Sequence, residues 1–422
     1  MNLKNYRIAI IGLGYVGLPL LIEFSKKYSA LGFDINKKRV EELNKGLDRT
    51  NEIPNSLIED RLKSGLIITN NFELLSSYNI YIITVPTPID KLKEPNLDYL
   101  EKASVTVARY LRKDDVVIYE STVYPGCTEE FCVPVLEQNS KLEYNKDFYC
   151  GYSPERINPG DKINTLTKIK KVTSGSNKET AILVDNLYKS IIDAGTHLTS
   201  SIKVAEACKA IENAQRDLNI SFMNEIALIF DLLGVDTNDV IDAASTKWNF
   251  LNFRPGIVGG HCISVDPYYL VHKAKTLGYD PEVILSGRRI NDKMGQFIAE
   301  KVIKLMKQNN ISIKNSNVLI LGITFKENMS DIRNSKVVDI YNFLRLKGLK
   351  VDVYDPHADK EEVKLEFNIK MIENLNQYDS IVVAVAHDVF KGLNFKLLKK
   401  TDKSVIYDIK GILKKSEING RL

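Results

Sequence analysis

The chain has 422 residues and a mass of 47.8 kDa, which at roughly 150 residues per domain predicts two to three domains. Hydrophobic residues make up 44% and charged residues 27%, with a mean hydropathy of −0.17, which excludes a disordered or membrane-embedded chain. Its 58 basic and 54 acidic residues leave a net charge of +4, too small over this length to indicate nucleic acid or an anionic membrane as a partner.

The first part of the chain alternates short apolar runs with helix-like stretches, which is typical of a doubly wound parallel sheet. The first run continues towards Phe24, but glycines and Pro19 interrupt it, so we expect neither a signal peptide nor a membrane span. The strands that we predict lie at residues 7–11, 29–33, 80–85, 116–119 and 148–152.

The middle of the chain is helical in pattern. Residues 201–233 contain no proline, and Val204, Cys208 and Ile211 recur at helical spacing, which predicts one long helix. A second helix is predicted at residues 235–245. A loop rich in glycine and proline follows at residues 254–262.

The last third resumes the α/β rhythm and echoes the first part. Strands predicted at residues 318–321, 350–354, 381–385 and 405–408 match, in the same order, four strands of the first part. We therefore expect an α/β fold of two Rossmann-like, doubly wound parallel-sheet domains joined by a long central helix. The expected boundaries are residues 1–200, 201–300 and 301–422.

A dinucleotide fingerprint follows the first strand and opens a helix. Its glycines allow a tight turn, a close approach of the pyrophosphate, and packing of the helix on the strand. Asp34, twenty residues after Gly14, is placed to accept the ribose 2′-hydroxyl and to repel a 2′-phosphate. NAD is the predicted cofactor, although Lys37, Lys38 and Arg39 leave tolerance of NADP open. The fingerprint reads Gly12-Leu13-Gly14-Tyr15-Val16-Gly17.

Two further loops leave strand ends at the same carboxyl edge, where ligands of such sheets bind. They are Val85-Pro86-Thr87-Pro88 and Glu120-Ser121-Thr122-Val123-Tyr124-Pro125-Gly126. Thr87 and Thr122 supply small donors there, although each loop taken alone could be a simple turn.

Three later motifs complete an ordered set. They are Tyr152-Ser153-Pro154-Glu155-Arg156, Gly259-Gly260-His261-Cys262 and Gly322-Ile323-Thr324-Phe325-Lys326-Glu327-Asn328. The set resembles the UDP-glucose/GDP-mannose dehydrogenase family over essentially the whole chain. The resemblance implies oxidation of a nucleotide sugar's C6 alcohol to a carboxylate, with two NAD per turnover and no metal. It also implies an NAD domain at residues 1–200, a helical dimerisation region at 201–300 and a UDP-sugar domain at 301–422.

A cysteine nucleophile explains how one site oxidises an alcohol twice. An aldehyde yields a second hydride only after a nucleophile adds to its carbonyl, and the thioester that results is open to hydrolysis. Cys262, in a glycine loop, is the candidate among five cysteines, and Cys208 falls on the apolar side of the long helix. The residues alone leave the role of Cys262 open, and the resemblance assigns it the nucleophile.

The other catalytic roles follow from the resemblance. Lys209 and Asn213, one helical turn apart, hold the oxyanion and a water, and Lys209 also donates a proton. Asp266, helped by Thr122, is the base or the carboxylate that positions water, and Glu155 serves thioester hydrolysis. Which carboxylate takes the first alcohol proton stays open.

The ligand-binding candidates come from the same motifs. Lys326 is matched to a substrate contact, Arg333 to an arginine that reaches NAD, and Lys410 to the UDP phosphates. For NAD the full set is Gly12, Gly14, Tyr15, Val16, Gly17, Asp34, Arg39, Thr87, Thr122 and Arg333. For the substrate it is Glu155, Arg156, Lys209, Asn213, Arg254, Gly259, Lys326 and Lys410.

The sugar is indicated by the stretches at 156–161, 248–256 and 259–269, which resemble the bacterial branch acting on UDP-N-acetylhexosamines. UDP-GlcNAc or UDP-GalNAc is the expected substrate, for surface polysaccharides, with UDP-ManNAc or UDP-glucose as the alternative. Arg254 and Trp248 are expected at the sugar pocket, although ordinary packing explains Trp248 equally well.

Two rival functions stay open: an alcohol dehydrogenase that releases aldehyde, and a non-catalytic NAD-binding scaffold. We expect a cytoplasmic homodimer that meets through the long helix and binds neither nucleic acid nor membrane. His197, His272, His357 and His387 fall in no catalytic motif and are expected at the surface or in loops.

Overall fold

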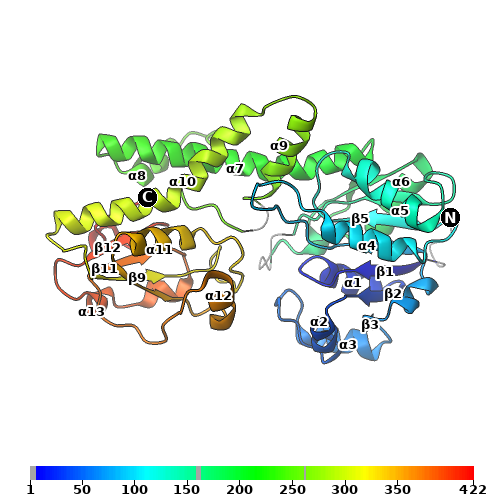
Figure 1. Ribbon diagram of the computed structural model, residues 1–422, viewed down its shortest axis with the longest axis horizontal. Helices are drawn as coiled ribbons and strands as arrows, with labels where there is room; N and C mark the ends of the chain where they lie inside the picture. The colour runs from blue at the N-terminus through cyan, green and yellow to red at the C-terminus, as the bar shows by residue number, and fades with distance from the viewer. Residues whose placement is uncertain (1–5, 158–162, 261–262) are drawn as a thin grey trace. The chain divides into compact units, whose positions relative to one another are not determined.

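The computed structural model describes residues 6–157, 163–260 and 263–422 (Figure 1). The chain divides into two compact units, each with its own sheet. The first consists of Met1–Glu212 and Tyr268–Tyr279, and the second of Asn213–Pro267 and Asp280–Leu422.

The first unit is built on an eight-stranded sheet in the order β3-β2-β1-β4-β5-β6-β7-β8. Neighbours pair in parallel except β6 and β7, which are antiparallel. The strand order reverses between β1 and β4, the switch point at which such sheets bind ligands. The strands are β1 (Arg7–Ile11), β2 (Ser29–Phe33), β3 (Ile67–Thr69), β4 (Ile80–Ile83), β5 (Val116–Tyr119), β6 (Tyr149–Tyr152), β7 (Lys171–Gly175) and β8 (Thr196–Leu198).

Helices cover both faces of this sheet. Alternate strand residues point to opposite faces, so Ile8 of β1 packs in one cluster with Leu21, and Ala9 packs in the other with Leu100. This two-sided burial explains why the strands read as uninterrupted apolar runs. The helices are α1 (Gly17–Ser25), α2 (Lys37–Asn44), α3 (Asn55–Lys63), α4 (Asp98–Ala108), α5 (Val133–Ser140) and α6 (Lys178–Lys189).

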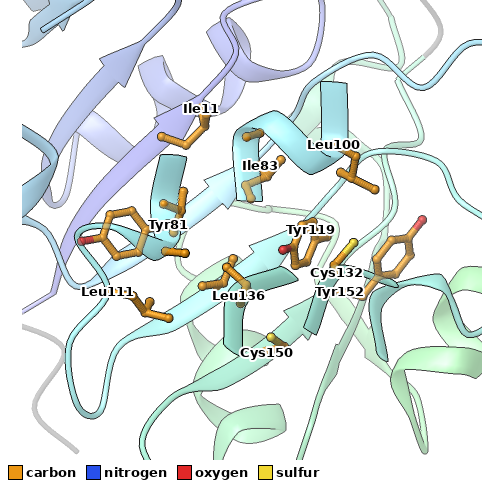
Figure 2. Packing of buried hydrophobic residues seen from close by; sticks show 14 of the residues in the cluster. Ile11, Tyr81, Ile83, Leu100, Leu111, Tyr119, Cys132, Leu136, Cys150 and Tyr152 are labelled. Atoms are coloured by element: carbon orange, nitrogen blue, oxygen red, sulfur yellow. The ribbon is translucent and has the colours of Figure 1, made fainter. Parts of the chain in front are cut away.

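Three cysteines belong to this core. Cys127, Cys132 and Cys150 are completely buried, and Figure 2 shows Cys132 and Cys150 among Tyr119, Tyr152 and aliphatic side chains. Burial raises the pKa of the thiols of Cys132 and Cys150 well above the ordinary value. Since the thiolate is the reactive form, these two cysteines are structural.

The second unit is built on a five-stranded, all-parallel sheet in the order β10-β9-β11-β12-β13. Its order reverses between β9 and β11. Long α10 and α11 pack on one face, where Met294 and Ile340 join Val318 in one cluster (Figure 1). The strands are β9 (Asn317–Leu321), β10 (Lys350–Tyr354), β11 (Ser380–Val383), β12 (Val405–Asp408) and β13 (Gly420–Arg421).

Two helices contain residues of both units: α7 (Ile202–Leu233) and α9 (Asp266–Thr276). The boundary in α7 falls between Glu212 and Asn213. The remaining helices are α8 (Thr237–Ala244), α10 (Glu282–Gln308), α11 (Val337–Leu346), α12 (Lys360–Phe367) and α13 (Phe395–Leu398).

The predicted fold class is confirmed: two units with parallel sheets, and a long helix over residues 202–233. The prediction missed the short β3 and β13, and it ended the first sheet at β6, whereas the sheet continues into the antiparallel β7 and then β8. The apolar pattern hides β7, since three of its buried residues are the polar Lys171, Thr173 and Ser174.

Candidate active site

The dinucleotide loop has the geometry that its glycines require. Gly12 has φ of +95°, and its N–H donates to the Phe33 carbonyl at 2.8 Å. A Cβ on Gly17 would lie 1.8 Å from the Gly12 carbonyl oxygen, so α1 reaches β1 only through a glycine. A Cβ on the exposed Gly14 would meet no atom within 4 Å among the described residues, which leaves room for a phosphate there.

Asp34 lies beside this loop at the end of β2. One carboxylate oxygen accepts the N–H of Leu13 at 2.9 Å, and the other accepts that of Asn36 at 2.8 Å. The side chain is only half-buried, so its remaining acceptor sites face outwards, where they suit a ribose hydroxyl. The loop, the N-terminus of α1 and this carboxylate therefore fit NAD.

Arg39, a predicted cofactor ligand, is instead buried as a support of the loop. Its Nε donates to the Leu13 carbonyl at 2.8 Å, and its guanidinium pairs with Asp48 at 2.9 Å. Burial opposes ionisation of Asp48, but hydrogen bonds from Thr50 and the charge of Arg39 lower its pKa overall. Sequence alone could not distinguish a buried arginine from one that faces a 2′-phosphate.

Two predicted loops are tied together beside the switch point. The Thr87 hydroxyl donates to the Thr122 carbonyl at 2.7 Å, and the Ser121 hydroxyl donates to the Val85 carbonyl at 2.6 Å. Tyr269 donates to the Thr87 carbonyl at 2.7 Å. Thr87 and Thr122 are thus brought together, as their common sheet edge predicts.

Glu206, which the sequence analysis missed, anchors α7 to the same region. Its carboxylate accepts the N–H groups of Gly126 at 2.5 Å and Thr128 at 2.9 Å. Burial raises its pKa to about 7. The buried Lys209 follows three residues later on α7, so the contacts that Glu206 makes also fix the position of Lys209.

The Glu155 loop is also held against α7. Arg156 pairs with Glu212 at 2.6 Å and donates to the Lys170 carbonyl at 2.7 Å. One oxygen of Glu155 accepts the N–H groups of Arg156 and Ile157. Glu155 itself is only 8% exposed.

In the second unit, Asn213 donates from Nδ2 to a carboxylate oxygen of Asp266 at 2.5 Å. These two predicted residues are 53 positions apart, and Asp266 is almost completely buried at the start of α9. His261 and Cys262, the predicted nucleophile, lie outside the described residues.

The glycine loop before Cys262 packs on the loop after β9. A Cβ on Gly259 would lie 2.8 Å from the Asn334 carbonyl oxygen, and one on Gly260 would lie 2.9 Å from the ring of Phe325. Gly259 and the stretch that contains Lys326 are therefore adjacent within the second unit.

A buried amide clamp holds this glycine loop at Gly256, and the sequence analysis missed it. Asn224 of α7 accepts the Gly256 N–H at 2.8 Å and donates to the Gly256 carbonyl at 3.0 Å. The clamp continues through Asn291 to Asp217, at 2.7 Å for each contact. The sequence could not identify these residues, because a single Asn belongs to no local motif and its hydrogen-bond partners are far away in the chain.

Of the residues predicted to bind phosphate, sugar or NAD, Lys410 lies against the glycine loop, whereas Arg254 and Arg333 each pair with an aspartate. The Lys410 ammonium packs over Gly256, where an added Cβ would lie 2.6 Å from Nζ. Arg254 is exposed and pairs with Asp242 at 2.5 Å, and Arg333 pairs with Asp331 at 2.5 Å.

Within residues 6–157, 163–260 and 263–422, no helix is both long and apolar enough to span a membrane. The same residues contain no cluster of three or more His, Cys, Asp or Glu side chains that could hold a metal ion.

The fold and these side chains define a dinucleotide-dependent oxidoreductase of two parallel-sheet units. Models of one family match the chain as an NAD binding domain at residues 6–192, a central domain at 203–293 and a UDP binding domain at 319–415. The chain therefore belongs to the UDP-glucose/GDP-mannose dehydrogenase family, as its motifs predict.

Within this family, the chain is similar to dehydrogenases of UDP-N-acetylhexosamines. The chain is 52% identical to a UDP-N-acetyl-D-glucosamine 6-dehydrogenase of Pseudomonas aeruginosa and 52% identical to one of Salmonella typhi, each over 100% of both chains. Among solved structures, it resembles a UDP-D-ManNAc dehydrogenase of Pyrococcus horikoshii with a TM-score of 0.89, 32% identity and 98% coverage of both chains.

Proposed function

We propose that the protein oxidises the C6 hydroxyl of UDP-N-acetyl-D-glucosamine to a carboxylate, using two NAD per turnover. The observation that carries this proposal is the 52% identity, over the full length, to two relatives named for that substrate. Identity falls to 32% for the structure named for UDP-D-ManNAc. UDP-GalNAc is the second candidate, because it differs from UDP-GlcNAc only in the configuration at C4 and keeps the same C6 hydroxymethyl and 2-acetamido groups.

The reaction balances without a metal. One alcohol, one water and two NAD⁺ give one carboxylate, two NADH and three protons. NAD, when bound, accepts a hydride from C6 in each oxidation. The first oxidation leaves an aldehyde, and the Cys262 thiolate adds to its carbonyl carbon to give a thiohemiacetal, which loses the second hydride as a thioester.

Lys209 and Asn213 stabilise the negative charge that develops on the C6 oxygen, and Asp266 positions Asn213 and water. The buried position of Lys209 and the Asn213–Asp266 hydrogen bond support these roles, because a preorganised, desolvated donor is a strong one. Glu155 takes the proton of the water that attacks the thioester, with Thr122 as a further donor at the site.

The nucleotide end is held by point charges. Lys410 and Lys326 bind the UDP phosphates, and Arg156 and Arg254 contact the sugar side. The close approach of the Lys410 ammonium to Gly256 supports its role. NAD is bound by the loop from Gly12 to Gly17, by Asp34 and by Thr87, with Arg333 also contributing.

The state of the cysteines supports a location for the protein in the cell. The four described cysteines are free thiols, which supports a reducing compartment, the cytoplasm.

We propose a homodimer, because α7 and the turn after it expose a run of large apolar side chains. These are Phe222, Ile229, Leu232, Leu233 and Val235. The uronic acid product suits the assembly of surface polysaccharides.

The test is the NADH yield from limiting UDP-GlcNAc, UDP-GalNAc, UDP-ManNAc and UDP-glucose. We expect about two NADH per UDP-GlcNAc and the highest kcat/KM for that sugar. Cys262→Ser will stop after the first oxidation, whereas Cys208→Ser, a partly buried thiol that contacts Glu212, will retain the full yield. One NADH per sugar from the wild type would establish the two-electron rival, and no NADH from any sugar would revive the scaffold.

A further inference from the structure

A buried ion pair lies beneath the Glu155 loop. The Lys171 ammonium, at the start of β7, donates to a Glu120 carboxylate oxygen at 2.6 Å, and the two side chains are 3% and 0% exposed. Glu120 follows β5, and its other oxygen accepts the Tyr188 hydroxyl from α6. Three elements of the first unit thus meet at one pair of charges.

The same ammonium reaches the Glu155 loop directly. Lys171 donates to the Pro154 carbonyl at 3.0 Å and lies 3.7 Å from Oε2 of Glu155. Oε1 of Glu155 is occupied by two backbone N–H groups, whereas Oε2 has no hydrogen-bond partner within the described residues. The carboxylate is therefore held at one oxygen, and its other oxygen faces the ammonium.

Two carboxylates share this one ammonium. Burial raises the pKa of Glu120 to about 7, the charge of Lys171 opposes that rise, and the charge of Glu155 adds to it. An ion pair so deep gives little net stability, because desolvation offsets the Coulomb attraction. Because the pair contributes little to stability, its position next to Glu155 indicates that it orients that carboxylate.

We propose that Lys171 and Glu120 are positioning residues that hold Glu155 for thioester hydrolysis, with Tyr188 fixing the Glu120 carboxylate; this rests on the proposed role of Glu155. In that step the water oxygen bonds to the thioester carbonyl carbon and a water proton passes to Oε2 of Glu155. The carbon–sulfur bond then breaks and the Cys262 thiolate leaves. Lys171 keeps Oε2 oriented until the proton arrives.

The experiment separates the oxidations from hydrolysis by rapid mixing of the full-length enzyme with UDP-GlcNAc and excess NAD. The double variant Glu120→Gln/Lys171→Met removes both charges together, so neither is left buried alone. We expect an NADH burst at the wild-type rate, followed by turnover about tenfold to a hundredfold slower. Intact-protein mass spectrometry will show the sugar thioester accumulating on the enzyme.

A milder pair of variants keeps the test decisive if the double variant does not fold. Tyr188→Phe removes only the hydrogen bond to Glu120 and will slow the step after the burst. Tyr119→Phe is the matched control, because its hydroxyl is equally buried in the same unit but bonds to Ser104 at 2.8 Å. The control will keep the wild-type rate after the burst.

Two results would overturn the proposal: wild-type turnover in Tyr188→Phe, or equal slowing of burst and turnover in both tyrosine variants. A wild-type enzyme that forms no NADH from UDP-GlcNAc, or only one per sugar, would instead contradict the proposed function, so the two failures are distinguishable.

Discussion

The two sheets carry the same turn at their switch points, and they use it differently. Gly12 and Gly322 have φ of +95° and +90°, and each donates its N–H to the neighbouring strand, at 2.8 Å and 2.9 Å. In both units an aspartate that follows the neighbouring strand accepts the N–H of the residue after the glycine. Asp34 accepts the N–H of Leu13, and Asp355 accepts that of Ile323.

The surroundings of the two aspartates differ. Asp34 is half-buried and accepts two backbone N–H groups, whereas Asp355 is 3% exposed and accepts four, from Ile323, Thr324, His357 and Ala358. His387, which was expected at the surface or in a loop, lies in a loop but is completely buried, 3.1 Å from the same carboxylate.

The helix that follows the turn differs as well. α1 begins at Gly17, five residues after Gly12, whereas α11 begins only at Val337, after a loop that contains Lys326 and Arg333. The comparison teaches that a strand, a glycine turn and an acid do not by themselves make a ribose site. The acid must also keep acceptor sites that the protein does not occupy.

The largest effect that we expect is on stability, from Asp355→Asn. An amide cannot accept all of the hydrogen bonds that Asp355 receives, and we expect a loss of about 3–5 kcal/mol in the free energy of unfolding. Asp34→Asn, the matched change, will cost about 1 kcal/mol or less. Urea titrations followed by circular dichroism measure both, and equal losses would erase the distinction between the two turns.

The next effect is on the cofactor. Asp34→Ala removes the carboxylate that we propose accepts the ribose hydroxyls, so the KM for NAD will rise about tenfold to a hundredfold, and the preference for NAD over NADP will shrink. Steady-state rates with both cofactors measure this. An unchanged KM for NAD would mean that Asp34, like Asp355, serves only its own loop.

The pH dependence of stability sharpens the contrast. Burial by itself would raise the pKa of Asp355, but the hydrogen bond and charge of His387, with the backbone N–H groups, hold it below the ordinary value. A carboxyl with a lowered pKa stabilises the fold above its unfolded pKa of about 3.9 and loses that contribution as the pH falls through its folded pKa. The stability gap between wild type and Asp355→Asn will therefore shrink as the pH falls below about 4. A gap that widens on acidification would reverse the assigned sign.

The smallest effect that we expect concerns the two proposed phosphate sites, which are a helix N-terminus in the first unit and Lys410 in the second. Gly256→Ala places a methyl group 2.6 Å from the Lys410 ammonium, which must move, and we expect the affinity for UDP to fall about threefold to tenfold. Gly392→Ala is the control, since its Cβ would meet no atom within 4 Å among the described residues. Calorimetric titration with UDP measures both, and equal affinities would remove Lys410 from the phosphate site.

Local pattern was sufficient for the parallel strands and the long helix. The apolar runs of β1, β2, β4 and β5 are buried on both faces, and α7 begins and ends within one residue of its predicted bounds. Pattern failed at β7, because a strand whose buried side chains are polar gives no apolar signal. It also failed at Glu206, Asn224 and Lys171, whose partners are 80, 32 and 51 residues away.

The sequence by itself determined the cofactor loop, the position of Asp34 and the family, because glycine spacing and ordered motifs are local properties of the chain. Only the tertiary structure decided which polar side chains became supports: Arg39 beneath the NAD loop, His387 beneath Asp355, and the Glu120–Lys171 pair beneath Glu155. The physical reason is that burial requires a partner for each charge, and that partner comes from whichever element the fold packs against it.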